Sequence, residues 1–237
     1  MDYSKVRLYL ANGDSRWWSL PWVSAGVVLA AALVTALPGA GPALEYDRAR
    51  VAAGEVWRLA TAQLVHWTPR MALADLGVIL VLGAWLESRG RRRAVVLALA
   101  LAAGLALAGV AVALPHLARY RGSSGPASAL LVLAALEIAR PPSRRGERAL
   151  ALLALALFAV KVTWETVTGQ ALFAGRLPVG VDVAPLAHLL GGVAGAVVFG
   201  LRRSRAVLGH RPGPFPVGKT EGRTQIADPG DQDAEPQ

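Results

Sequence analysis

The chain has 237 residues, of which 54% are hydrophobic, and a formal net charge of +9. This hydrophobic fraction is higher than that of ordinary soluble domains and favours a membrane protein. The absence of cysteine excludes a disulfide framework and a thiolate metal site. The positive charge does not predict nucleic-acid binding, because arginine and lysine gather between apolar segments and no basic face with interleaved aromatic residues is present.

Six apolar segments have about the length that a helix needs to cross a membrane. In chain order they cover about residues 20–37, 71–86, 94–114, 124–139, 149–167 and 183–201. The fourth is only just long enough, so that five or seven spans are the alternatives to six. We predict an all-α, polytopic membrane protein with a six-helix bundle over residues 20–203, a cytoplasmic segment at 1–19 and a disordered cytoplasmic tail at 204–237.

Basic clusters predict the orientation of the spans. They precede the first span and follow the second, fourth and sixth, and they consist of Lys5, Arg7 and Arg16, then Arg89, Arg91, Arg92 and Arg93, then Arg140, Arg144, Arg145 and Arg148, and then Arg202, Arg203 and Arg205. With six spans, all four clusters fall on one side, which the positive-inside rule makes cytoplasmic. Both termini are then inside. A signal peptide ending near Ala40 is the alternative for the N-terminus, although the apolar run is long for one.

A serine and a histidine lie inside separate apolar segments, where such groups generally mark a functional site. Ser124 begins the fourth segment, and His188 lies near the start of the sixth. From the rise per residue of a helix, Ser124, His188 and Asp75 each stand roughly 21–24 Å above the basic cluster that follows their segment. A serine with a histidine as general base is the minimal nucleophile pair for acyl transfer. No metal-binding motif or carboxylate pair indicates another protease class.

Small residues would allow the segments that carry this pair to approach each other. His188, Gly191 and Gly195 share one helical face, and the two glycines form a GxxxG pattern. Backbone N–H groups at a glycine-flanked helix start could stabilise an oxyanion. Helix packing alone is the alternative explanation of these glycines. The candidate residues are Gly122 and Ser123 for support of the oxyanion, and Gly125, Gly191 and Gly195 for helix packing.

The ordered motifs resemble the rhomboid family of intramembrane serine proteases over about residues 54–200. Gly54–Arg58 (GEVWR) is similar to the family's Trp-Arg motif before the second span, and His66 follows at the position of a histidine common in the family. Gly122–Gly125 (GSSG) resembles the family's GxSG motif. Ala187–Gly195 (AHLLGGVAG) resembles its AH...G...G motif.

This resemblance implies an intramembrane serine endopeptidase that hydrolyses a peptide bond in or next to a transmembrane segment. It makes Ser124 the nucleophile and His188 the general base of a dyad that needs no third acid. It also implies six spans, both ends inside, a site open to the outer side, and no cofactor or metal.

A narrower resemblance is to the rhombosortase branch, through Lys161–Glu165 (KVTWE), Val183–His188 (VAPLAH) and the compact loops. That branch is associated with removing a C-terminal Gly-Gly-type anchor from exported proteins in Gram-negative bacteria. The implied partners are the lipid bilayer and a membrane-anchored protein with a C-terminal Gly-rich motif and a transmembrane segment. The implied place is the bacterial inner membrane, with the active site opening to the periplasm. Lys161, Trp164 and Glu165 are candidate gate or substrate contacts; the alternative for Lys161 and Glu165 is an i, i+4 ion pair.

Two departures from the family pattern bear on activity. Where many rhomboids have a histidine and an asparagine on the second span, this chain has Met71 and Asp75. Methionine cannot donate a hydrogen bond, and an ionised aspartate would repel an oxyanion. Asp75 could donate if it is protonated, or it could orient His188. Ser128 replaces the aromatic residue or histidine that often packs on the catalytic histidine. The alternative function is therefore a catalytically inactive pseudoprotease that binds transmembrane segments. A transporter would need inverted repeats, which the sequence does not show.

Overall fold

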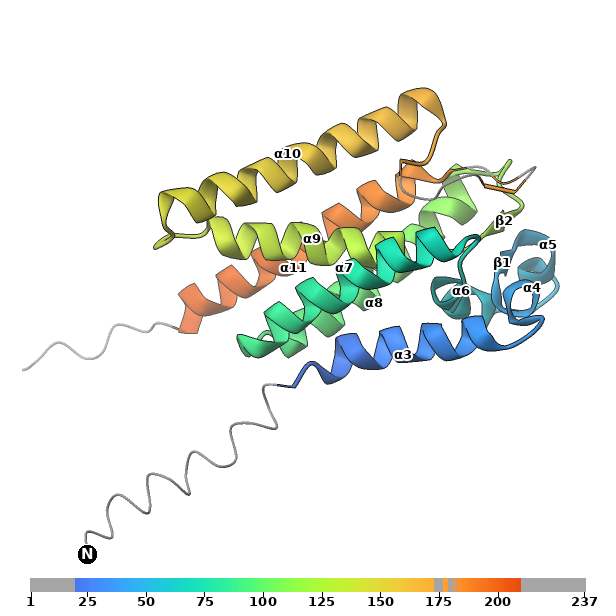
Figure 1. The fold of residues 1–237 in the computed structure, drawn as a ribbon, viewed down its shortest axis with the longest axis horizontal. Helices are drawn as coiled ribbons and strands as arrows, with labels where there is room; N and C mark the ends of the chain where they lie inside the picture. Colours follow the sequence, from blue (N-terminus) through green and yellow to red (C-terminus); the bar gives the residue numbers. More distant parts are fainter. Residues whose placement is uncertain (1–19, 173–176, 179–180, 182, 210–237) are drawn as a thin grey trace, which may run out of the picture.

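The computed structural model describes residues 20–172, 177–178, 181 and 183–209. The chain is mostly helical, which confirms the predicted class at the level of a helical membrane protein, and its long helices run side by side (Figure 1). The elements in chain order are α3 (Trp22–Ala36), α4 (Ala40–Leu44), β1 (Tyr46–Asp47), α5 (Arg48–Ala52), α6 (Arg58–Thr61), η1 (Ala62–Leu64), α7 (Pro69–Ser88), α8 (Arg92–Ala113), β2 (Arg119–Tyr120), α9 (Ser124–Ala139), α10 (Arg145–Thr168) and α11 (Pro185–Gly209).

Each of the six predicted apolar segments forms a helix, but the helices differ in length. Among the described residues, α7, α8, α10 and residues 185–204 of α11 are long and apolar enough to cross a membrane. α3 has 15 residues and α9 has 16. At the rise of a helix these two span about 22–24 Å, less than the hydrocarbon core of about 30 Å. The count of six full-length spans is therefore not confirmed.

Prolines explain why α3 and α9 stop early. Leu37 and Arg140 follow the two helices, have extended backbones, and precede Pro38 and Pro141. A residue before proline is disfavoured in the helical region, so both helices end there. α9 contacts α7, α8, α10 and α11. Because these helices surround it, a helix shorter than the membrane is covered there by protein and not by lipid.

The last helix continues beyond residue 203, where the membrane domain was predicted to end. α11 continues to Gly209, because Ala206, Val207 and Leu208 extend the helical sequence and no breaker precedes the glycine. The predicted segment at 1–19 and the rest of the predicted tail, 210–237, lie outside the described residues.

Three of the basic clusters meet at one end of the bundle. Glu137 at the end of α9 pairs with Arg202 of α11 at 2.7 Å and with Arg91, just before α8, at 3.8 Å. Arg92 at the start of α8 lies 3.4 Å from Glu87 at the end of α7. These ion pairs place the connections that carry the arginines at the same end, as six alternating helices require.

The buried carboxylate of Glu87 caps α3 from another helix. Its oxygens accept hydrogen bonds from the backbone N–H groups of Val23 at 3.1 Å and Ser24 at 2.9 Å. The first N–H groups of a helix have no acceptor within the helix and attract negative charge, so this carboxylate fixes the start of α3 against the end of α7.

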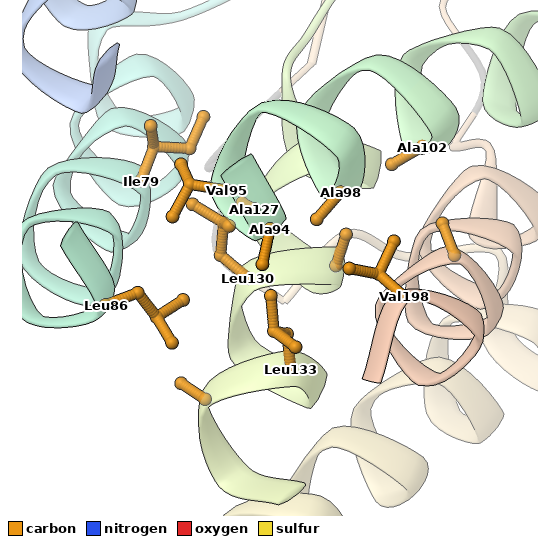
Figure 2. Packing of buried hydrophobic residues seen from close by; sticks show 13 residues of the cluster. Ile79, Leu86, Ala94, Val95, Ala98, Ala102, Ala127, Leu130, Leu133 and Val198 are labelled. Carbon is orange, nitrogen blue, oxygen red and sulfur yellow. The ribbon is translucent and has the colours of Figure 1, made fainter. Parts of the chain in front are cut away.

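The core between the helices consists of small and branched apolar side chains. Figure 2 shows those of α7, α8, α9 and α11 meeting around Leu130 and Leu133 of α9. Alanines 94, 98 and 102 of α8 lie one turn apart and are all buried. Since lipid is as apolar as these side chains, close packing rather than the hydrophobic effect holds such helices together, and small residues make the packing close.

The opposite end of the bundle is closed by the connection between α3 and α7. β1 pairs antiparallel with β2, with Tyr46 opposite Tyr120, and so ties this connection to the chain just before α9. Arg58, which is 2% exposed, donates to the carbonyl oxygens of Pro42 at 2.9 Å and Glu45 at 3.0 Å. The Trp-Arg motif thus lies within this connection and braces it.

Candidate active site

A cavity lies at the end of the bundle that carries β1 and β2, between α7, α9, α10 and α11. Its walls include apolar residues such as Met71, Leu131 and Phe158. Its polar and charged lining consists of Asp75, Tyr120, Arg121, Ser124, Ser128, Lys161, Glu165 and His188. The three polar groups placed at one depth by helical rise, Ser124, His188 and Asp75, therefore line the same cavity.

Ser124 is the first residue of α9, and the glycine before it shapes the loop. Gly122 has a φ of +130°, a conformation that L side chains rarely adopt, and its N–H donates to the Ala62 carbonyl oxygen at 3.1 Å. Met71 packs against the α-carbon side of Gly122, where an added β-carbon would collide with the Met71 methyl group. Ala62 and Met71 therefore hold the loop in place. Ser124 lies in the cavity wall, with 7% of its surface exposed.

His188 stands in the first turn of α11, next to the start of α9. A β-carbon on Gly191 would collide with the carbonyl oxygen of Gly125, and one on Gly195 with that of Ala129. These glycines thus put α11 in direct backbone contact with α9. Because Gly125 follows Ser124 and Gly191 lies one turn after His188, the same contact brings the serine and the histidine to one site.

Glu165 and Lys161 of α10 complete a charged cluster around the histidine. Nδ1 of His188 lies 2.8 Å from Oε2 of Glu165 and 3.1 Å from Nζ of Lys161. Lys161 Nζ donates to the same carboxylate oxygen at 2.7 Å. The i, i+4 ion pair that the sequence left as an alternative is therefore present, and it also contacts His188.

Asp75 of α7 is the second carboxylate that lines the cavity. Its Oδ2 is 3.6 Å from Nε2 of His66, and the same histidine nitrogen is 3.1 Å from Oγ of Ser123. The position at Nδ1 of His188 that an orienting acid would occupy is held by Glu165. Asp75 therefore contacts His66, and Glu165 contacts His188.

The remaining residues considered for the site are Ser128, Tyr120 and Trp164. Ser128 donates from its hydroxyl to the carbonyl oxygen of Ser124 at 2.7 Å, one helical turn away. Burial raises the pKa of the Tyr120 phenol well above its usual value, so this side chain stays neutral beside the serine. Trp164 is 51% exposed and does not belong to the cavity lining, unlike Lys161 and Glu165.

The comparison with protein-family models gives a match over the helical part of the chain. The Rhomboid domain matches residues 53–205, about two thirds of the chain. The chain belongs to the rhomboid family. Rhomboids are in general serine proteases that act on membrane proteins within the bilayer. The match, with the four apolar helices of spanning length in the described part of the chain, makes this rhomboid a multi-pass membrane protein. No curated protein matches the chain.

The matched residues include Lys161, Glu165 and His188. The match does not distinguish the rhombosortase branch from other rhomboids. The contact between Glu165 and His188 is the part of the site that the sequence reasoning missed, since the resemblance implied a dyad without a third acid. A signal for it was present, because a lysine and a glutamate inside an apolar segment generally have a functional partner.

Proposed function

We propose that this rhomboid is an intramembrane serine protease in which Ser124 is the nucleophile and His188 the general base. The observation that carries the proposal is the contact of Gly125 with Gly191, which brings Ser124 and His188 to one cavity at the helix starts. A lone buried histidine in a helix bundle would need neither a neighbouring serine nor a backbone contact beside it.

The mechanism follows from the two nitrogens of His188. Nδ1 faces Glu165, so Nε2 is the nitrogen that accepts the proton of Ser124 Oγ as this oxygen attacks the peptide carbonyl carbon. The tetrahedral intermediate collapses to an acyl-enzyme, and the His188 proton passes to the leaving amine. Water, deprotonated by the same nitrogen, then releases the acid product and restores the serine.

The start of α9 supplies the stabilisation of the oxyanion in this proposal. The N–H groups of Ser124 and Gly125 belong to the first turn of a helix, which has no intrahelical acceptors for them and carries partial positive charge. Met71 offers no donor, and an ionised Asp75 disfavours an oxyanion. The backbone therefore carries more of this function than a side chain on α7 does.

For the substrate, we propose removal of a C-terminal Gly-Gly-type sorting anchor from exported proteins, as in rhombosortases. The motifs at Lys161–Glu165 and Val183–His188 support this choice, and the first lines the cavity through two of its residues. The proposed location is the bacterial inner membrane, with the arginine-rich end of the bundle in the cytoplasm and the cavity end toward the periplasm.

Fluorophosphonate labelling in membranes tests the nucleophile without knowledge of the substrate. We expect the wild type to be labelled and both Ser124→Ala and His188→Ala to lose labelling. Ser128→Ala is the matched control, since Ser128 lies one turn further along α9, lines the same cavity and is equally exposed at 7%; it should keep labelling. A folded wild type that a cavity-sized probe does not label would favour the pseudoprotease.

A reporter protein tests the substrate class separately. It carries at its C-terminus a Gly-Gly motif, an apolar span and a basic end, and it is expressed with the wild type or with Ser124→Ala. We expect a shortened reporter with the wild type alone, and mass spectrometry of its new C-terminus locates the cut. Equal cleavage of a control in which Leu-Leu replaces Gly-Gly would refute the sorting-anchor substrate and leave the protease assignment intact.

A further inference from the structure

We propose that Glu165 is a positioning residue for His188, so that the site works as a serine–histidine–glutamate set held together by Lys161. This inference rests on the proposed function, because it assigns a role within the same proton transfer. It departs from the dyad that the family resemblance implies. It is based on the three contacts that join Lys161, Glu165 and His188 in pairs.

The carboxylate of Glu165 is fixed on both oxygens. Oε2 lies 2.8 Å from His188 Nδ1 and 2.7 Å from Lys161 Nζ, while Oε1 accepts from the backbone N–H of Leu172 at 3.1 Å. Glu165 is 2% exposed. Burying a carboxylate is costly unless it is paired and hydrogen-bonded, and here the pairing is with the proposed general base itself. A side chain that served only to neutralise Lys161 would not need to reach the imidazole.

The choice of histidine tautomer decides whether His188 can act. If Nδ1 carries the hydrogen and donates a hydrogen bond to Glu165, Nε2 keeps a lone pair and can take the proton of Ser124. If Nδ1 instead accepts a hydrogen bond from Lys161 at 3.1 Å, Nε2 carries the hydrogen and cannot act as a base. The shorter carboxylate contact favours the first arrangement, and Lys161 already donates to Oε2 of Glu165. Glu165 therefore selects the active tautomer and stabilises the imidazolium that forms during the reaction.

Other charged groups around the cavity do not compete for Nδ1. Asp75 of α7 lies 3.6 Å from His66, and Arg121 lies 2.7 Å from Glu45. Tyr120, before α9, is neutral because burial raises its pKa. α8 meets α11 near the histidine through apolar contacts of Gly109 with leucines. The local field at His188 therefore comes mainly from the two residues of α10.

The first experiment is the pH dependence of fluorophosphonate labelling in Glu165→Gln. Loss of the negative charge should slow labelling roughly tenfold or more. It should also move the acid limb of the profile to lower pH by about one unit, because the imidazolium is no longer stabilised. Glu165→Asp keeps the charge and should keep the acid limb nearer its wild-type position. Glu137→Gln, at the other end of the bundle, is the control that should change neither. An unchanged rate and profile in Glu165→Gln would overturn the inference.

The second experiment does not depend on activity. The ¹⁵N NMR signals of His188 are measured in the Ser124→Ala protein, with His188→Asn used to assign them. We expect a hydrogen on Nδ1 in the neutral form, and a titration that moves to lower pH when Glu165→Gln is added. A hydrogen on Nε2 would overturn the inference, and this result needs no substitution of Glu165. If the wild type is not labelled but the NMR result is as expected, the proposed function fails while the positioning contact stands.

Discussion

The contact between Gly191 and Gly125 gives the sharpest quantitative prediction. In Gly191→Ala the new β-carbon would lie 2.7 Å from the Gly125 carbonyl carbon and 2.9 Å from its α-carbon. Both partners are backbone atoms and cannot rotate away. An ordinary contact begins at 3.4 Å, and the carbonyl oxygen of Gly125 would lie nearer still, so α9 and α11 must separate locally by at least about 0.7 Å. Because Ser124 and His188 sit beside this contact, the separation acts directly on the proton transfer.

We expect Gly191→Ala to lower the labelling rate by roughly tenfold to a hundredfold, since a displacement of this size spoils the alignment of reacting groups. Overpacking should also lower the free energy of unfolding by about 1–3 kcal/mol. The assay is the rate of fluorophosphonate labelling together with thermal unfolding in detergent. Gly200→Ala on the same helix is the control, because a β-carbon there meets nothing within 4 Å; it should behave as wild type. A Gly191→Ala protein with wild-type rate and stability would refute the argument that backbone contact sets the site.

Three further predictions concern Asp75 in the cavity and two residues that hold the fold together, Glu87 and Arg58. Asp75→Asn should keep labelling within about threefold, because Asp75 lies beside His66 while Glu165 contacts His188, and the backbone at the start of α9 stabilises the oxyanion in the proposed mechanism; a loss of more than tenfold in the labelling assay would show that the carboxyl group is needed. Glu87→Ala should lower the free energy of unfolding by about 2 kcal/mol or more through loss of the α3 cap, measured by thermal unfolding; an unchanged midpoint would contradict that role. Arg58→Lys should cost a similar amount, about 2 kcal/mol in the same assay, because the three contacts come from two nitrogens of the rigid guanidinium, and an ammonium group has only one nitrogen; stability equal to wild type would show that charge alone suffices there.

The sequence predicts the parts of this protein that depend on helical geometry. Because the rise per residue is fixed, counting from the basic clusters put Ser124, His188 and Asp75 at one depth, and the three line one cavity. The spacing of Gly191 and Gly195 likewise predicted a close helix contact. Both inferences need only the local shape of a helix, which apolar patterning identifies well.

The parts that depend on packing between distant segments were not predictable in the same way. The ion pair with Lys161 gave Glu165 a complete local explanation, and only the position of α11 against α10 shows that the carboxylate also reaches His188. The contacts of α9 with α7, α8, α10 and α11 likewise join segments that lie far apart in the chain. The pairing of β1 with β2 joins short segments far apart in the chain, and neither segment has an alternating pattern that would mark it as a strand.

The cap that Glu87 provides for α3 has a consequence for biogenesis. A helix capped by its own neighbouring residues has its cap as soon as those residues emerge from the ribosome. α3 is capped by a side chain 63 residues further along the chain, so its first turn stays incomplete until α7 has been synthesised to its end. α3 and α7 can then reach their final arrangement only together, because the carboxylate of Glu87 on α7 completes the first turn of α3. A nascent chain arrested before Glu87 should leave the start of α3 open to protease, and one arrested well beyond it should protect the same site.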